Sequence, residues 1–360
     1  MRALLVALMF GLLVTAASAD IVVPSMHVYV ESVSGADTTW VEVEVTDVQQ
    51  AIDLSYMLIN HPFAGYPGHD EVVLLSPGRY DSVSTFSTVF GVKTAVAKLF
   101  DGVTLRGFDR DVCLIDQRSA EYGILCEDVG AGAVVENLTV TGGGSRDRGR
   151  VDDGDGRDLV AGIACLDGGS PTIRNVSIEG AATGVVVNTL HDDAAPTIEG
   201  TVIARGSHHG VYIKENGATP VTIHETTIVQ NFDVGIYVFG GSAAITNSSV
   251  THNGREGIRS YLVDPVVEMC NVWWNDRGSD VPANYGGDLT DLTGVDGNIS
   301  EEPFYCDFTG IFGYDYHVCV ASPNIPPQSA EQIGAFGMGC TSCESPVAEV
   351  SWGAIKALYR

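Results

Sequence analysis

The sequence is poor in basic residues, with 19 lysines and arginines against 46 aspartates and glutamates and a formal net charge of −27 at pH 7. Only four residues are lysines. Nucleic acids and anionic lipids are bound through clusters of Lys and Arg, so this composition argues against both as partners. The acidic surface favours a cation such as Ca²⁺, or it serves only to keep the protein in solution.

Long hydrophobic runs are absent after the first residues, so we expect no transmembrane segment. The N-terminus has Arg2, an apolar stretch over residues 3–14 and small residues at 17–19. This order predicts a signal peptide that is cleaved after Ala19. We therefore expect a protein that starts at Asp20 and is secreted, periplasmic or held at the cell surface.

Cysteines are few, and four of the eight fall between Cys306 and Cys343. An exported protein can oxidise them to disulfides, and four cysteines permit three pairings that the sequence leaves open. We interpret Cys340-x-x-Cys343 as structural disulfide chemistry, because no βαβ unit of a redox domain accompanies it. Cys126 in GILC and Cys165 in GIAC occupy equivalent places, which predicts an inward-facing cysteine ladder.

A short pattern recurs every 22 to 25 residues, with one step of 38. Apolar pairs spaced by five stand in phase with Gly-apolar pairs, and this fixed period indicates a solenoid. The apolar pairs are Val135/Val140, Ile173/Ile178, Ile198/Ile203, Ile223/Ile228, Ile245/Val250 and Val267/Val272. The Gly-apolar pairs start at Gly123, Gly162, Gly184, Gly210, Gly235 and Gly257.

The runs are short and rich in β-branched residues, which favours strands over helices. Asn137, Asn175 and Asn247 follow the first apolar residue by two, and Asn suits a tight left-handed turn between strands. Each repeat is thus predicted to be one coil of about three strands, stacked in parallel on the next coil. The 38-residue step holds an insertion at residues 142–159 that we expect to form a surface loop on a normal coil.

These residues resemble the right-handed parallel β-helix proteins of the pectin-lyase-like superfamily. The resemblance is carried by PTIRNVSIEGAATGVVV, VTIHETTIVQNFDVGIYV and AITNSSVTHNGREGI, and it extends over roughly residues 46–343 with both flanks. It implies an all-β fold, a right-handed parallel β-helix solenoid with an N-terminal capping helix and a cysteine-containing C-terminal cap. Because one such solenoid hosts many activities, the fold alone does not name the function.

The organisation predicted from these signals has five parts. They are a signal peptide (1–19), an N-terminal β-hairpin (20–45), the β-helix (46–300), a Cys-rich closing segment (301–343) and a C-terminal tail (344–360). Thr46 and Gln49 form a capping box ahead of VQQAIDLSYMLI, a helix that we expect to plug the N-terminal end of the solenoid. The tail SWGAIKALYR is either an export or anchoring tag or a terminal helix.

Alternation along the Gly-apolar strands predicts a strip on one outer face of the solenoid. It is formed by Tyr212, Lys214, Tyr237, Phe239, Arg259 and Tyr261. Flat rings with cations beside them suit an acidic polysaccharide or cell-surface glycan, and in the superfamily glycan clefts commonly run along such a face. Because these rings lie outside the core in this interpretation, we expect alanine at Tyr212 or Tyr237 to leave the fold intact. The alternative is that loops cover the rings.

Catalytic candidates are Asp192, Asp193, His209 and Arg259, in loops and strands beside the strip. Paired carboxylates can serve as acid and base in glycoside hydrolysis, and an arginine can serve as the base of a lyase. NTLHDD and SHHGVYIK resemble polygalacturonase elements, but Leu190 stands where that family has Asp and Tyr212 where it has Arg.

Metal candidates are confined to an acidic loop and to three histidines. Asp152, Asp153, Asp155 and Asp158 lie in a Gly-containing stretch that could hold Ca²⁺, although the spacing fails the EF-hand pattern. His191, His208 and His209 give a weaker indication of metal handling.

Three functions follow as hypotheses. The first is an exported, non-catalytic β-helix protein that binds glycan or serves as a surface or structural module. The second is a polysaccharide lyase or glycoside hydrolase acting on acidic polysaccharide. The third is a periplasmic accessory protein that handles metal.

Overall fold

The computed structural model describes residues 26–34, 37–45, 47–60, 71–142, 160–276, 283–308, 314–325, 332–341 and 343. The expected signal peptide, the acidic loop at 152–158 and the C-terminal tail lie outside these residues. Within the described part of the chain, no helix has the length and hydrophobicity needed to cross a bilayer.

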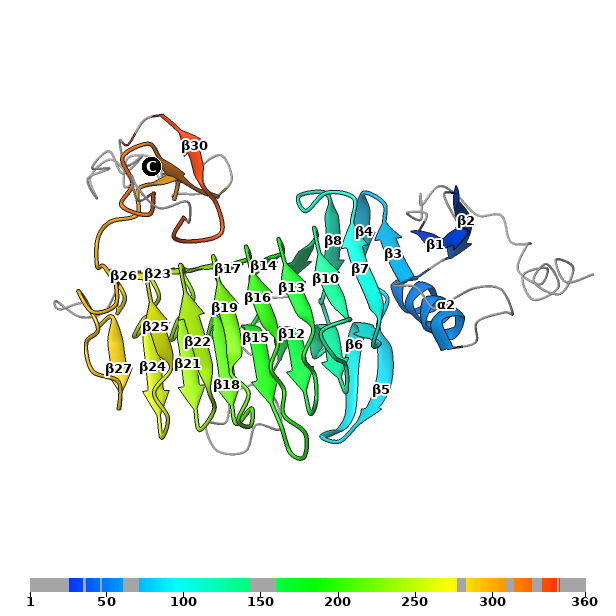
Figure 1. The fold of residues 1–360 in the computed structure, drawn as a ribbon, viewed down its shortest axis with the longest axis horizontal. Coiled ribbons are helices and arrows are strands. Elements are labelled where there is room, and N and C mark those ends of the chain that lie inside the picture. The colour runs from blue at the N-terminus through cyan, green and yellow to red at the C-terminus, as the bar shows by residue number, and fades with distance from the viewer. Residues whose placement is uncertain are drawn as a thin grey trace, which may run out of the picture.

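Three sheets run side by side along a solenoid, and each coil contributes one short strand to each sheet in turn (Figure 1). Sheet A contains parallel β3 (Glu71–Leu75), β7 (Val103–Gly107), β10 (Val134–Glu136), β13 (Thr172–Arg174), β16 (Thr197–Glu199), β19 (Val221–His224), β22 (Ala243–Thr246) and β25 (Val266–Glu268). Sheet B contains β4 (Gly78–Tyr80), β8 (Cys113–Asp116), β11 (Thr139–Thr141), β14 (Ser177–Glu179), β17 (Val202–Ala204), β20 (Thr227–Val229), β23 (Ser249–Thr251) and β26 (Asn271–Trp273).

Sheet C is the third face of the solenoid. It contains β5 (Ser84–Thr88), β6 (Gly91–Leu99), β9 (Tyr122–Glu127), β12 (Ala161–Leu166), β15 (Thr183–Asn188), β18 (Val211–Lys214), β21 (Ile236–Phe239), β24 (Ile258–Tyr261) and β27 (Tyr285–Gly287). All neighbours in this sheet are parallel except the hairpin β5–β6. Pairing across the 38-residue step is unbroken, since β12 pairs with both β9 and β15.

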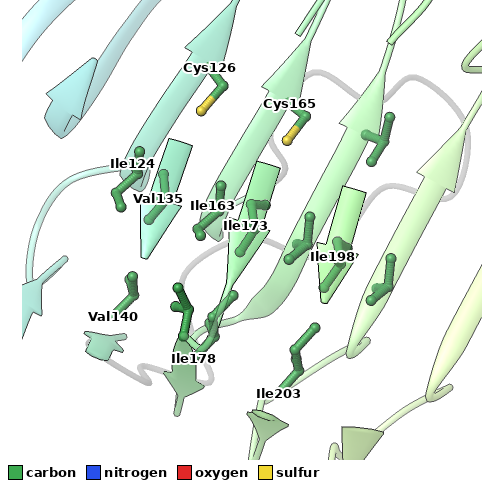
Figure 2. Packing of buried hydrophobic residues seen from close by; sticks show 14 of the residues in the cluster. Ile124, Cys126, Val135, Val140, Ile163, Cys165, Ile173, Ile178, Ile198 and Ile203 are labelled. Carbon is green, nitrogen blue, oxygen red and sulfur yellow. The ribbon is translucent and has the colours of Figure 1, made fainter. Parts of the chain in front are cut away.

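The core consists of inward ladders whose members are the repeated apolar residues. Ile173, for example, pairs with Val135 on one side and Ile198 on the other, as the sequence period predicts. Figure 2 shows these ladders, with Cys126 and Cys165 stacked in neighbouring strands of sheet C. Both cysteines are buried, which confirms the predicted cysteine ladder, and desolvation raises the pKa of Cys165.

The turn between sheets A and B explains the asparagines of the repeat. Asn137, Asn175 and Asn247 have φ of +55°, +50° and +48°, the left-handed conformation that Asn tolerates. The turn between sheets B and C holds a buried asparagine ladder, defined here as Asn231, Asn253 and Asn275. In it the side-chain oxygen of Asn253 accepts hydrogen bonds from the backbone and side-chain N–H groups of Asn231, both at 3.0 Å.

The repeated glycines mark a close approach between coils. A Cβ atom on Gly210 would lie 2.6 Å from the carbonyl oxygen of Gly235 and 2.5 Å from Cγ2 of Ile228. Gly184 meets the carbonyl oxygen of Gly210 in the same way, at 2.5 Å. At the start of each sheet C strand, the backbones of two successive coils leave no room for a side chain. The repeated glycine is therefore required at this position.

Gly210→Ala is expected to lower the free energy of unfolding by about 3 kcal/mol, since the new methyl group forces two packed coils apart. Urea unfolding followed by circular dichroism measures the change. Gly132→Ala is the matched control, because its Cβ would have no neighbour nearer than 3.7 Å. Equal stability of the two variants would show that the coils separate freely at this point.

The N-terminal end is closed as predicted by a hairpin and a helix. β1 (Met26–Ser34) and β2 (Asp37–Val45) pair antiparallel and extend sheet A beyond β3. Helix α2 (Val48–Asn60) lies at the N-terminal end of the solenoid (Figure 1). It buries Val48, Ala51 and Ile52 against the core. The helix is capped by Asp47, whose carboxylate accepts the N–H of Gln50 at 2.8 Å. Gln49 exchanges hydrogen bonds with the backbone of Lys98 in β6. Thr46, the other residue of the expected capping box, lies outside the described residues.

The C-terminal segment lies against the outer face of sheet B. Its strands are β28 (Tyr305–Asp307), β29 (Asp315–Cys319) and β30 (Met338–Cys340), and disulfides join Cys306 to Cys340 and Cys319 to Cys343. Tyr305 is buried there, with its hydroxyl 3.0 Å from the hydroxyls of both Ser249 and Thr251. Burial raises the pKa of Tyr305 to about 12. This segment packs on β17, β20 and β23 of sheet B.

Candidate functional site

The six predicted strip residues share the outer face of β18, β21 and β24. Tyr212 pairs with Tyr237, which pairs with Arg259. In the second row Lys214 pairs with Phe239, which pairs with Tyr261. The alternation of the sequence thus correctly predicts two rows of side chains on neighbouring coils.

The rings of the strip contact one another edge to face. Tyr237, Phe239 and Tyr261 have centroid distances of 6.1 to 6.3 Å and interplanar angles near 70°. The guanidinium carbon of Arg259 lies 5.7 Å from the centre of the Tyr237 ring and 4.9 Å from that of Tyr261. Arg259 also donates a hydrogen bond to the Tyr261 hydroxyl. All four side chains are partly exposed, so a ligand can reach both ring edges and the cation.

Tyr212 lies outside the solenoid core but not at the protein surface. It is 3% exposed and packs in a second apolar cluster with Leu125, Ala164 and Val186, the outward residues of earlier coils. Phe86 and Phe90 of the β5–β6 hairpin pack against the same cluster. The expectation that Tyr212 offers an accessible ring is therefore wrong in this structure, and the accessible strip consists of the other five residues.

A polar cluster flanks the strip where strands β18, β21 and β24 begin. His209 Nδ1 lies 3.8 Å from Asp233 Oδ2, and the His209 ring lies 5.3 Å from that of Tyr237. Asp233 Oδ1 is 3.2 Å from Arg255 Nε. Of these residues, only His209 was a candidate from the sequence. Asp233 and Arg255 belong to turns that carry no recognised motif.

Glu256 completes this cluster beside Arg259. Its Oε2 atom lies 3.7 Å from Arg259 Nη1. Glu256 Oε2 and Arg259 Nε are both buried without a hydrogen-bond partner among the described residues. Buried polar atoms are nearly always satisfied by protein or by water, so we expect a water molecule or a polar ligand group beside these two atoms.

The electrostatics of Arg259 keep it charged. Partial burial lowers its pKa, but the hydrogen bond to Tyr261 and the charge of Glu256 act more strongly together, and the net pKa lies above the ordinary value. Arginine is protonated in proteins at all working pH values. The strip therefore presents a fixed positive charge between two aromatic rings.

The catalytic candidates Asp192 and Asp193 lie at the opposite end of sheet C from His209. They follow β15, whereas His209 precedes the parallel neighbour β18, so a strand of four residues, about 13 Å, separates the two ends. Asp193 Oδ2 accepts the N–H of Ala218 at 3.0 Å. The structure thus brings His209 near the Arg259 part of the strip and leaves both aspartates apart from it.

The loop that carries Asp192 is organised by Asp167. The carboxylate of Asp167 accepts the N–H groups of Leu190, His191 and Asp192 at 2.8, 2.6 and 3.1 Å. Burial raises the pKa of Asp167, but these three hydrogen bonds outweigh it and hold the pKa below the ordinary value. Asp167 therefore has a structural role, which is to hold the loop that follows β15.

Metal binding receives no support from the described residues. His191 follows β15, whereas His208 and His209 precede β18, so the three histidines do not converge. No group of three or more His, Cys, Asp or Glu side chains in the described ranges is arranged to hold a metal ion. Asp152, Asp153, Asp155 and Asp158 lie outside these ranges.

Comparison with known proteins supports the fold. Residues 97–253 match the family model for the right handed beta helix region. No curated protein matches the sequence. The strand order shows a parallel β-solenoid, as the sequence predicts, and residues 97–253 of it are similar to the right handed beta helix region family.

Three solved structures are similar to this chain. The A-module of the Azotobacter vinelandii mannuronan C-5 epimerase AlgE4 is 18% identical, with 64% of this chain and 68% of that chain covered and a TM-score of 0.42. The catalytic domain of a GH87 alpha-1,3-glucanase is 12% identical over 85% and 52%, with a TM-score of 0.38. A tailspike capsular polysaccharide depolymerase of Acinetobacter baumannii bacteriophage Fri1 is 12% identical over 76% and 55%, with a TM-score of 0.37.

This chain spans about half the length of the glucanase and tailspike chains. At these identities and TM-scores the likeness carries no argument about activity.

Proposed function

We propose that this protein binds an acidic polysaccharide along the accessible strip of sheet C. The observation that carries the proposal is Arg259, which lies between the Tyr237 and Tyr261 rings and is partly exposed with an unsatisfied buried Nε. A uronic acid offers an apolar ring face and a carboxylate. Aromatic rings pack against the first, and a guanidinium binds the second with two parallel hydrogen bonds.

The rest of the strip fits a chain of sugars rather than a single one. Neighbouring coils are about 4.8 Å apart, so the rows from Lys214 to Tyr261 extend over two coil spacings. Lys214 adds a second cation at one end of the second row, and Phe239 lies between it and Tyr261. The protein has a net charge of −27 and repels anions over most of its surface. The cations of the strip therefore favour binding of an anionic ligand at the strip over other parts of the surface.

The test is a binding panel of polygalacturonate, alginate and neutral dextran, each with and without Ca²⁺. Tyr237→Ala is expected to weaken binding of an acidic polymer about tenfold, the effect of losing one well-placed ring. Phe108→Ala is the control, because Phe108 is 70% exposed and lies in the turn after β7, far from the strip in sequence. Absence of binding to every acidic polymer, or equal loss in both variants, would contradict the proposal.

An enzymatic function is a second candidate, favoured by the polar cluster. His209 near Asp233, with Glu256 beside Arg259, provides groups of the kind that accept and donate protons. The same polymers, incubated with the protein and analysed for chain shortening, test this. Turnover that His209→Ala removes would support a polysaccharide lyase or hydrolase, and binding without turnover would support the non-catalytic module.

A further inference from the structure

The turn between sheets B and C forms a ridge with the same backbone conformation in four successive coils. Its first residues are Arg205, Gln230, His252 and Trp274, with φ of +59°, +58°, +56° and +49°. The first three contact the C-terminal segment. Arg205 lies over the Tyr314 ring, Gln230 accepts a hydrogen bond from Tyr316, and His252 packs on Phe308.

Trp274 differs from the other three because its side chain is 51% exposed. A bulky residue in the left-handed region is uncommon, since its Cβ crowds the backbone there. The carbonyl of the preceding Trp273 accepts hydrogen bonds from the N–H of His252 and from Nδ2 of Asn275, both at 3.2 Å. Asn275 is buried in the asparagine ladder. The backbone is thus fixed on both sides of Trp274, and its ring is exposed at a position whose equivalents in the three earlier coils contact the C-terminal segment.

The Trp274 ring is also braced from one side. Its centroid lies 5.5 Å from that of Trp273, which contacts the His252 ring at 5.0 Å. A ring that is already held in place loses little conformational freedom when it binds, which favours a stacking role.

Phe232 is a second exposed ring on the same ridge. It is 65% exposed and lies two coils before Trp274, a separation of about 10 Å along the solenoid axis. This spacing suits a short, extended oligosaccharide that stacks one end on the Phe232 ring and the other end on the Trp274 ring. Two separated rings do not form the contiguous apolar patch that a protein partner requires.

The charges of the ridge argue against an anionic ligand. Asp276 follows Trp274 within two residues. The nearby cation Arg255 has Asp233 at 3.2 Å. Arg205 is paired with Glu179. The two described cations beside the ridge are thus each paired with a carboxylate.

We propose that the Trp274–Phe232 ridge is a second carbohydrate site, which stacks the sugar rings of a neutral oligosaccharide. It is separate from the strip in position, since it lies on the turn between sheets B and C, and in ligand charge. The inference does not depend on the acidic polysaccharide proposal.

Tryptophan fluorescence tests the ridge without interference from the strip, because the four tryptophans are Trp40, Trp273, Trp274 and Trp352 and none lies in the strip. Maltohexaose, cellohexaose and chitohexaose are the probes, each titrated into the full chain. We expect at least one to give a saturable change in emission. Trp274→Ala should abolish that change, and Phe232→Ala should raise the apparent Kd about tenfold.

Three controls make the result decisive. Phe108→Ala and Arg259→Gln should leave the titration unchanged, since neither residue belongs to the ridge. Trp274→Phe should fold as the wild type and retain weakened binding measured by calorimetry. The proposal is overturned if no probe gives a saturable change, if Trp274→Ala binds as well as the wild type, or if Trp274→Ala alters only self-association.

Discussion

Arg259→Gln is expected to weaken binding of an acidic polysaccharide about 30-fold, because a hydrogen-bonded charge contributes about 2 kcal/mol to such a complex. The wild-type guanidinium is held between Tyr237 and Tyr261 and stays protonated, so its loss removes the one fixed cation of the first row. Isothermal titration calorimetry with polygalacturonate or alginate oligomers measures the change. Neutral dextran should be unaffected.

The matched control for Arg259 is Arg174→Gln, which removes the same charge from another face of the solenoid. Arg174 is half exposed on sheet A and pairs with Glu136, which also pairs with Arg106. If both variants lose affinity equally, the effect is one of net charge and the strip has no special part in it. Arg259→Lys adds a further distinction, since lysine keeps the charge but loses the two parallel donors of the guanidinium.

The fold could be predicted because one physical constraint repeats in every coil. Inward residues must be apolar, and Gly210 must be glycine because Gly235 approaches it in the next coil. Asn175 occupies a turn that has a positive φ. These requirements are local, so they leave a periodic trace in the sequence that fixes both the strands and their register.

The site was only partly predictable because exposure is not local. Alternation places Tyr212 and Tyr237 on the same outer row, yet the structure buries Tyr212 in a cluster that also receives Phe86 from a hairpin far away in sequence. The polar cluster was missed for another reason. Asp233 and Arg255 each precede the repeated glycine by two residues, and aligning the turns on those glycines would have placed both beside His208.

The separation of Asp192 from His209 also follows from chain order. A loop that follows a strand and a loop that precedes its parallel neighbour lie at opposite edges of the sheet. Loops of adjacent coils were expected to lie together beside the strip, but the strand order places these two at opposite ends of the strands. Five strip residues are accessible where alternation predicts them, and their role in glycan binding stays a prediction. The carboxylates near His209 and Arg259 are those of Asp233 and Glu256.

Tyr212→Ala is expected to lower the free energy of unfolding by about 4 kcal/mol, the usual effect of removing a buried aromatic ring. Tyr212 is 3% exposed, and its ring lies 5.5 Å from that of His209 and 5.2 Å from that of Tyr237. Urea unfolding measures the loss. Tyr212→Phe should retain most of the stability, because it keeps the ring and its packing.

The comparison of Tyr212→Ala with Tyr237→Ala separates structural from binding roles along one row. Tyr237 is partly exposed, so its truncation should change stability little and affinity strongly, whereas Tyr212 should show the reverse. Loss of ligand affinity in folded Tyr212→Ala would then arise through Tyr237 and His209, which rest against the Tyr212 ring. A stability change below about 0.5 kcal/mol, the range of surface substitutions, would instead mean that the Tyr212 ring is accessible in solution and that the first row has an accessible ring in β18 as well.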